Sequence, residues 1–202
     1  MSDRFEVRRA TAADESDLRA LVGSVAMPGA VAVRFAREPD YFLGTTIMGD
    51  PCDVVVARDR SSGALAGFAC RAERSAFANG VEERLGYVGQ IRVAKGYRGA
   101  GLLALGARLL RERTPPGQLA FGVLARENPR AIGALVGARP PGGVRAARLG
   151  GLTSCAVLLR PRRPPRVPGV EVRPADAVAL PDVVAFLRAE GARRQLFPAY
   201  TL

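Results

Sequence analysis

The sequence predicts an α/β (α+β) fold with a central, mixed, mostly antiparallel sheet that is flanked by helices. Two observations predict it: apolar and polar residues alternate in several short segments, and leucines recur at helical spacing over residues 102–110. Turn signals rich in Gly, Pro and Asn separate these segments. The chain has 202 residues, 48% of them hydrophobic, which is enough to bury one ordinary core.

The first part of the chain is expected to form a strand, two helices and a three-stranded antiparallel meander. The patterns predict helices over residues 12–22 and 31–42, the second ended or bent by Pro39. The predicted strands are residues 5–9, 54–57, 64–71 and 85–93. Turns at 61–63 and at Asn79-Gly80 join the strands of the meander.

The next part is expected to add a helix, a strand, a second helix and a hairpin. The leucine-rich helix, residues 102–113, is stopped by Pro115-Pro116-Gly117, and a buried strand follows at 119–124. Asn128 and Pro129 form an N-cap and first-turn signal for a short helix that ends near Gly137. Residues 144–148 and 152–159 predict the final hairpin.

These elements predict a domain over residues 1–160, a Pro/Arg-rich linker over 161–169 and a strand–helix segment over 170–202. The last segment repeats the start of the chain, with six identical residues in the fourteen positions 172–185. It is either the start of a second copy of the domain or a chance similarity in a chain rich in Ala and Arg.

Composition excludes several classes of site. The chain has no histidine, so Ser-His and Cys-His catalytic pairs and His-ligated metal sites are excluded. The three cysteines form no CxxC pair, so we predict no metal site and no disulfide framework. No apolar run reaches the ~18 residues of a membrane span, and the charged start does not resemble a signal peptide, so we expect a cytoplasmic protein that does not bind membranes.

The net charge of +11 raises nucleic acid as a partner. Lys95 is the only lysine among 30 basic residues, and the chain is rich in Ala, Gly and Pro, which indicates a compositional bias as much as a basic binding surface. Aromatic residues are 6% of the chain and Trp is absent, so few side chains could stack on bases. We therefore do not expect nucleic acid as the main partner.

Residues 90–110 carry the most chemical information, because a strand leads through a glycine-bearing turn into an amphipathic helix. The first N–H groups of a helix lack backbone partners, and the helix dipole favours anions there. Gly99 and Gly101 would let a pyrophosphate approach the backbone, and Arg98 adds a positive charge. Residues 99–104 also satisfy G-x-G-x-x-A, but the antiparallel meander and the lack of a downstream acid argue against a dinucleotide fold.

Residues 93–102, VAKGYRGAGL, resemble motif A of the GNAT acyltransferase superfamily, whose core pattern is R/Q-x-x-G-x-G/A. Arg98 and Gly101 match the pattern, whereas Leu103 stands where Gly or Ala is usual. The order of elements over residues 5–159 also resembles that fold, and the terminal repeat makes the chain a candidate for the N-terminal half of a tandem-GNAT protein.

The resemblance implies acetyl-CoA as the acyl donor and an amine as the acceptor. It implies that the strand backbone holds the pantetheine arm, through Ile91, Arg92 and Val93. It implies that N–H groups at the helix start hold the pyrophosphate, from Gly99, Ala100, Gly101, Leu102 and Leu103. Asn128 stands where the family often has an asparagine that contacts the CoA arm, although its role as an N-cap is an equal alternative.

The usual catalytic groups of the family are replaced here. Gln90 stands near the usual glutamate base, and Leu135 stands at the usual tyrosine acid. Tyr87 is the nearest phenol and the only catalytic candidate, whereas Glu82 and Glu83 are interpreted as a solvated hairpin edge. The resemblance also implies that the Val93 N–H polarises the thioester carbonyl.

Three functions remain open. The first is an acyl-CoA-dependent N-acyltransferase for a small amine or a peptide amine. The second is a catalytically silent acyl-CoA-binding or structural module, and the third is a nucleic-acid binder that uses Arg160–Arg166. The acceptor pocket would be built from residues 27–49 and the last hairpin, where acidic residues are sparse, so a mono-amine is favoured over a polycation.

Overall fold

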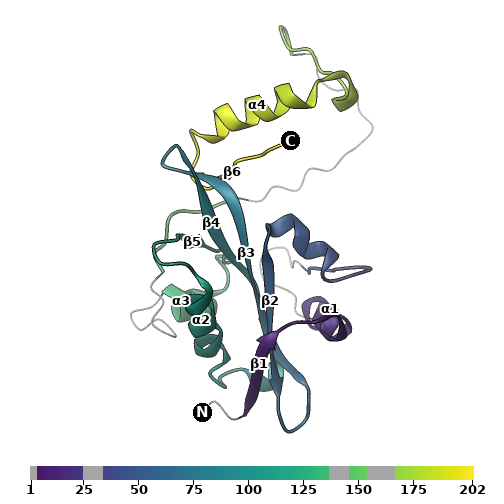
Figure 1. Ribbon diagram of the computed structural model, residues 1–202, viewed down its shortest axis with the longest axis vertical. Coiled ribbons are helices and arrows are strands. Elements are labelled where there is room, and N and C mark those ends of the chain that lie inside the picture. The colour runs from purple at the N-terminus through teal and green to yellow at the C-terminus, as the bar shows by residue number, and fades with distance from the viewer. Residues whose placement is uncertain (1–3, 25–33, 137–145, 154–166) are drawn as a thin grey trace.

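The computed structural model describes residues 4–24, 34–136, 146–153 and 167–202, and Figure 1 shows a central sheet with helices on both sides. The sheet has the order β1-β2-β3-β4-β5, with β6 paired to β3. Among the strand pairs of the described residues, β4–β5 is parallel and the others are antiparallel. The strands are β1 (Phe5–Arg9), β2 (Cys52–Asp59), β3 (Leu65–Ala78), β4 (Val81–Val93), β5 (Ala120–Phe121) and β6 (Phe197–Pro198). This mixed, mostly antiparallel sheet confirms the predicted fold class.

The helices divide between the two faces of the sheet and its far end (Figure 1). One face carries α1 (Glu15–Ser24) with the 3-10 turns η1 (Ala12–Asp14) and η2 (Leu43–Met48). The other carries η3 (Lys95–Tyr97), α2 (Leu102–Arg113) and α3 (Pro129–Val136). At the far end lie η5 (Ala175–Ala177) and α4 (Leu180–Gly191).

Each face of the sheet has its own apolar core. On the α1 side, Leu18 and Val22 pack with Tyr41 and Phe68 in a cluster of buried residues. On the α2 side, Leu102 packs with Phe5, Ala57 and Ala66. Successive side chains of a strand point to opposite faces, so both clusters draw on the same strands.

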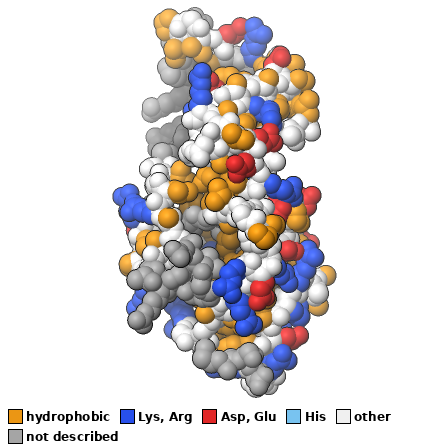
Figure 2. All heavy atoms as spheres, turned by 60° about the vertical axis from the view of Figure 1, so that its left-hand side comes forward, with side chains coloured by type: hydrophobic (Ala, Val, Ile, Leu, Met, Phe, Trp, Pro, Cys, Tyr) orange, Lys and Arg blue, Asp and Glu red, His pale blue; other side chains and the backbone are white. Residues whose placement is uncertain are grey.

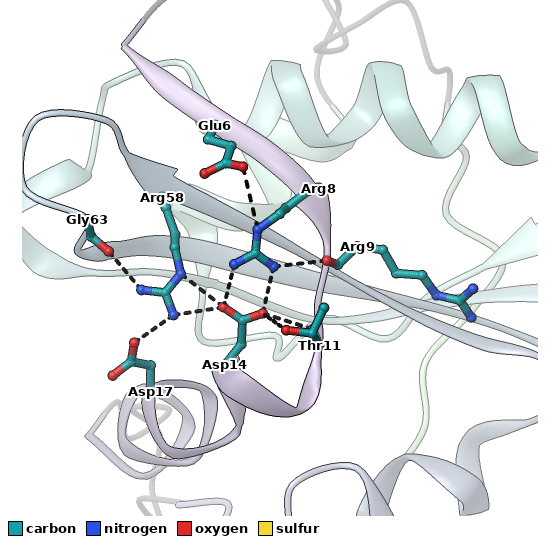
Figure 3. Close-up of polar contacts among 8 residues, drawn as sticks. All are labelled: Glu6, Arg8, Arg9, Thr11, Asp14, Asp17, Arg58 and Gly63. Carbon is teal, nitrogen blue, oxygen red and sulfur yellow. Dashed lines mark hydrogen bonds and ion pairs between the residues drawn. The ribbon is translucent and has the colours of Figure 1, made fainter.

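Asp14 fixes α1 against the sheet through the polar network of Figure 3. Its side chain is 1% exposed and forms ion pairs with Arg8 at 2.7 Å and Arg58 at 2.8 Å. The same carboxylate accepts the Thr11 backbone N–H at 2.8 Å, which completes a capping box at the start of η1. These contacts join β1, β2 and the start of α1, and the Arg8 hydrogen bond is the main reason that the pKa of Asp14 is lowered.

The predicted helix over residues 31–42 is wrong in its described part, because residues 34–42 contain no helix. Proline disfavours helical backbone at the residue before it and removes a hydrogen bond, so Pro39 acts as a breaker. Asp40 then accepts hydrogen bonds from the Phe42 and Leu43 backbone N–H groups, and the 3-10 turn η2 follows. Residues 31–33 lie outside the described part of the chain.

The two predicted strand regions after α2 also differ from the structure. The strand over 119–124 is reduced to Ala120–Phe121, because its ladder with β4 ends at the Tyr87–Phe121 pair. The hairpin over 144–148 and 152–159 has no strand within residues 146–153, where Leu149 and Leu152 are exposed. Its remaining residues, 144–145 and 154–159, lie outside the described residues.

The C-terminal segment packs on the end of the β3–β4 hairpin that extends beyond β2 (Figure 1). Leu196 and Ala199 donate backbone hydrogen bonds to Phe77 and Ser75 of β3. The predicted helix is present as α4, but the strand expected before it is absent, because residues 167–179 contain no strand. Val172 is 83% exposed, and a strand without a pairing partner gains no ladder hydrogen bonds. Residues 161–166 of the predicted linker lie outside the described part.

Candidate active site on strand β4 and helix α2

Strand β4 contains one extra residue near its end. Cys70 of β3 pairs with Gly89 and Phe68 pairs with Arg92, so two steps along β3 correspond to three along β4. The bulge falls at Gln90, whose φ of 52° is in the left-handed region. Because side chains alternate along a strand, the extra residue places Arg92 on the same face as Phe68 and the α1-side core.

The same strand presents an open backbone edge beyond Tyr87. Ala94 N–H donates to Ala66 O of β3 at 2.9 Å, and the Arg92 carbonyl lies against Gly67 of β3. Strand geometry therefore turns the N–H and C=O groups of Ile91 and Val93 away from β3. No described strand pairs with them there, because the β5 ladder has already ended.

Arg92 departs from its predicted backbone role in this geometry. Its carbonyl faces β3, whereas its guanidinium donates a hydrogen bond to the Ile91 carbonyl at 3.1 Å. Of the three predicted backbone positions, Ile91 and Val93 are the two with polar groups toward the open edge.

The N-terminus of α2 lies directly after this edge and is not capped by a side chain. Gly101 is the N-cap residue with left-handed φ and ψ of 80° and 4°, and Leu105 N–H donates to its carbonyl at 3.2 Å. Within the described residues, the N–H groups of Gly101, Leu102 and Leu103 have no acceptor. They are the orphan donors that a helix start offers to an anion.

The turn before the helix leaves this end accessible. Gly99 has a φ of 84°, and a Cβ placed there would meet no heavy atom within 4 Å. Arg98 is exposed beside it, whereas the Ala100 N–H is already used by Tyr97 O at 3.2 Å. The five predicted pyrophosphate residues therefore come together as one turn, with Ala100 the member whose N–H is engaged.

Asn128 lies at the start of α3, and its Oδ1 accepts the Ala131 backbone N–H at 3.1 Å. The N-cap alternative for this residue is thus confirmed. A contact with a CoA arm stays a prediction.

Tyr87 is half-buried on the α1-side face of β4, edge-on to Phe121 of β5 with ring centroids 5.4 Å apart. Its ring lies over Gly89, and a Cβ at that position would come within 2.7 Å of the ring. Glycine at residue 89 therefore leaves room for the Tyr87 side chain. Burial raises the pKa of the Tyr87 phenol. The phenol is therefore protonated at neutral pH and can donate a proton rather than accept one.

Tyr41 is a buried residue of this site that the sequence did not reveal. Its side chain is fully buried, and its hydroxyl donates to Gln90 Oε1 at 2.9 Å. Gln90 in turn directs its Nε2 at Met48 Sδ, 3.1 Å away. Tyr41 lies in the segment that was predicted to be a helix, so no local pattern pointed to its contact with β4.

Other predicted residues take structural positions. Glu82 and Glu83 are exposed at the hairpin edge, where Glu82 pairs with Arg188. Leu135 is half-buried in α3 and offers no titratable group. Cys52 and Cys70 are free thiols whose sulfur atoms lie 3.5 Å apart in the α1-side core.

Charges on the surface shown in Figure 2 are mixed, with acidic side chains interspersed among the basic ones. Arg160–Arg166, the candidate nucleic-acid segment, lies outside the described residues. In the described part of the chain, no helix is long and apolar enough to cross a membrane. Those residues also bring together no group of three His, Cys, Asp or Glu side chains that could hold a metal ion.

Comparison of the structure with known structures decides the fold. A putative acetyltransferase from Agrobacterium tumefaciens superimposes with a TM-score of 0.52 at 12% sequence identity, covering 74% of this chain and 99% of the other. An acetyltransferase from Trypanosoma brucei gives 0.51 at 18% identity, covering 75% and 99%. The chain has the GNAT fold. No protein-family model and no curated protein sequence matches the sequence.

Within this GNAT fold, α2 connects the parallel strands β4 and β5. G-x-G-x-x-A normally occurs in a parallel strand–helix–strand unit of this kind, but the other strand pairs of the described residues are antiparallel. The site therefore combines an open strand edge, an uncapped helix start and a buried tyrosine–glutamine contact on the α1 side.

Proposed function

We propose that this chain is an acyl-CoA-dependent N-acyltransferase that transfers acetyl from acetyl-CoA to a small amine or a peptide amine. The observation that carries the proposal is the uncapped start of α2, which follows directly from the open edge of β4. Unpaired N–H groups of Gly101, Leu102 and Leu103 suit a pyrophosphate, and Arg98 adds charge. An extended amide-containing arm suits the backbone groups of Ile91 and Val93.

The chain's own groups support a simple division of roles. Val93 N–H, directed away from β3, would donate a hydrogen bond to the thioester carbonyl and stabilise the developing oxyanion. Tyr87 would hold its proton until the thiolate leaves, because burial raises the pKa of its phenol. Gln90 cannot titrate, so the acceptor amine must reach the site neutral or lose its proton to water.

Calorimetric titration with acetyl-CoA tests the binding half of the proposal. Gly101→Trp is expected to abolish binding, because an indole would cover the N–H groups at the start of α2. Gly63→Trp is the matched control, since Gly63 also has a positive φ of 69° and open space around it but lies in the β2–β3 turn. Absence of acetyl-CoA binding to the unmodified protein at millimolar concentration would reject the proposal, and so would equal binding by both variants.

A catalytically silent acyl-CoA-binding module is the second candidate, favoured by Gln90 and Leu135 at the two usual acid–base positions. Release of free thiol from acetyl-CoA over a panel of amines separates the two functions. Steady turnover with any amine rejects the silent module. Binding without turnover across the whole panel supports it.

We also propose that residues 170–202 begin a second copy of the N-terminal motif. The positions of the two helices support this proposal. When the two copies are aligned, Leu180, the first residue of α4, falls at the position of Glu15, the first residue of α1. The strand that opens the first copy, β1, has no counterpart in residues 167–179, so the structural similarity is confined to the helix. Hydrogen exchange on the full chain is expected to show α4 exchanging as a unit faster than β3, and identical protection would contradict this.

A further inference from the structure

Two arginines beside Gln90 lack a carboxylate partner among the described residues, namely Arg37 and Arg92. Other arginines in the interior are paired: Arg58 contacts Asp14 at 2.8 Å, and Arg71 contacts Glu73 at 2.8 Å. Arg37 instead donates to the Gly44 carbonyl, and Arg92 to the Ile91 carbonyl. Neither guanidinium forms an ion pair within the described residues.

Both guanidiniums also leave a buried donor unsatisfied. The Nε atoms of Arg37 and Arg92 are buried and have no hydrogen-bond partner within the described part of the protein. The Nε of Arg71 is also unpartnered, but that guanidinium has Glu73 as its carboxylate neighbour. A buried donor of a charged group that remains unpaired is costly, so native proteins rarely keep one without a function. The Nε–H is one prong of the guanidinium fork, which binds carboxylates and phosphates through two parallel hydrogen bonds.

The two arginines converge on one place. An Arg37 terminal nitrogen and Gln90 Nε2 contact the same sulfur, Met48 Sδ, at 3.9 and 3.1 Å. Arg92 follows Gln90 by two residues, and the bulge turns it to the same face. Both guanidiniums lie close enough to Tyr41 to affect its pKa. Burial raises the pKa of the Tyr41 phenol, and the charges of Arg37 and Arg92 partly oppose this effect.

The acids near this place are already engaged. Asp53, whose charge acts on Cys52 as that of Arg37 does, is paired with Arg9 at 2.6 Å. Glu38 is paired with Arg19 at 2.6 Å, and the Asp40 carboxylate accepts the backbone N–H of Phe42 at 2.6 Å. Outside the described residues the sequence contains one acidic residue, Asp3. The missing anion is therefore best supplied by a ligand.

We infer that the amine acceptor carries an anionic group, a carboxylate or a phosphate, which binds Arg37 and Arg92 beside Gln90. This inference rests on the proposed acyl transfer and narrows its acceptor from amines in general to amino acids or phosphorylated amines. The arginines act by holding the acceptor. The site is on the α1 side of β4, the side that carries Tyr87.

The test compares each anionic amine with a partner that lacks the anionic group: O-phosphoethanolamine with ethanolamine, and glycine with the nearly isosteric glycinamide. Calorimetric binding of each probe is measured at low salt for the unmodified protein, for Arg37→Gln, for Arg92→Gln and for the double variant. We expect the anionic member of at least one pair to bind at least ten-fold more tightly. Each single variant should reduce that preference about ten-fold, since one charge-assisted hydrogen-bond pair is lost.

Arg60→Gln is the matched control, because Arg60 is exposed in the β2–β3 turn and its removal lowers the net charge equally. It should keep the preference. Arg37→Lys and Arg92→Lys keep the positive charge but lose the bidentate guanidinium, so they should show a preference between those of the unmodified protein and the glutamine variants. These lysine variants provide the test if a glutamine variant fails to fold. Which pair shows the preference distinguishes a phosphate from a carboxylate.

Equal binding of charged and neutral probes would overturn the inference, as would a preference that survives in the double variant or falls equally in Arg60→Gln. The same preparations are titrated with acetyl-CoA, so the two proposals fail separately. Binding of acetyl-CoA without an anionic preference removes only the inference. An anionic preference without acetyl-CoA binding removes the proposed acyl transfer and leaves an anion site that depends on these two arginines.

Discussion

Replacing Asp14 by asparagine should strongly destabilise the protein, because the substitution keeps the shape of the side chain and removes its charge. The Asp14 carboxylate is 1% exposed and accepts hydrogen bonds from Arg8, Arg58 and Thr11 at 2.7–3.2 Å (Figure 3). An asparagine would present its NH₂ group to arginine donors and remove the buried counter-ion that Arg8 and Arg58 share. Arg8 would keep only Glu6 at 3.7 Å, and Arg58 only Asp17 at 2.7 Å.

The expected loss is about 3–5 kcal/mol of unfolding free energy, the usual cost of removing one partner of a buried ion pair. This is a large share of the ~5–15 kcal/mol that stabilises an ordinary domain. Asp17→Asn is the matched control, because Asp17 contacts the same Arg58 at 2.7 Å but its side chain is 50% exposed. Its loss should be no more than about 1 kcal/mol.

Urea unfolding followed by far-ultraviolet circular dichroism measures both variants, and its pH dependence gives a second check. The pKa of Asp14 is lowered in the folded state, so its contribution is complete above the unfolded carboxyl pKa of about 3.9 and is lost as pH falls toward the folded value. The difference between the wild type and Asp14→Asn should therefore shrink below about pH 4. Equal losses for the Asp14 and Asp17 variants, or a difference that grows in acid, would refute this account.

Two further predictions concern the α1-side face. Gly49→Ala should lower the free energy of unfolding by more than about 2 kcal/mol, because the φ of Gly49 is 144° and the new Cβ would lie 2.1 Å from Glu73 O. Gly63→Ala, whose Cβ would meet no heavy atom within 4 Å, should lower it by about 1 kcal/mol. Equal losses in urea unfolding would contradict this prediction. Iodoacetamide should modify Cys52 before Cys70. Cys52 is half-buried, and its hydrogen bond with Cys70 is the main reason that its pKa is lowered. Cys70 is fully buried, and its pKa is raised. Peptide mass spectrometry gives the order of modification, and prior labelling of Cys70 would contradict the prediction.

The elements that the sequence predicted best are those whose signals are local. Helix α2 spans Leu102–Arg113 as predicted, because leucines at helical spacing and the Pro115-Pro116-Gly117 stop lie within one segment. The β3–β4 turn falls at Asn79-Gly80, where both residues have positive φ, 52° and 82°, as a two-residue hairpin turn of this type requires. The uncapped helix start after Arg98 was predictable for the same reason.

The features that were missed depend on distant parts of the chain. Tyr41 and Gln90 are 49 residues apart, and Asp14 and Arg58 are 44 apart, so no window of sequence contains either contact. The extra residue at Gln90 is equally invisible, because a bulge is defined by the register against β3 and not by the composition of β4. The apolar pattern of residues 31–42 was consistent with a helix, and only the position of Pro39 argued against it.

The bulge of β4 lets this strand carry one residue more than its partner without changing the pairing of the residues that follow. Deleting one residue between Gly89 and Arg92 would make the alternation regular, and Arg92 would still lie opposite Phe68 on the α1 side. The deletion would instead remove the left-handed backbone of Gln90, which directs its side chain to the Tyr41 hydroxyl. The extra residue therefore serves this one buried contact and leaves the course of the sheet unchanged.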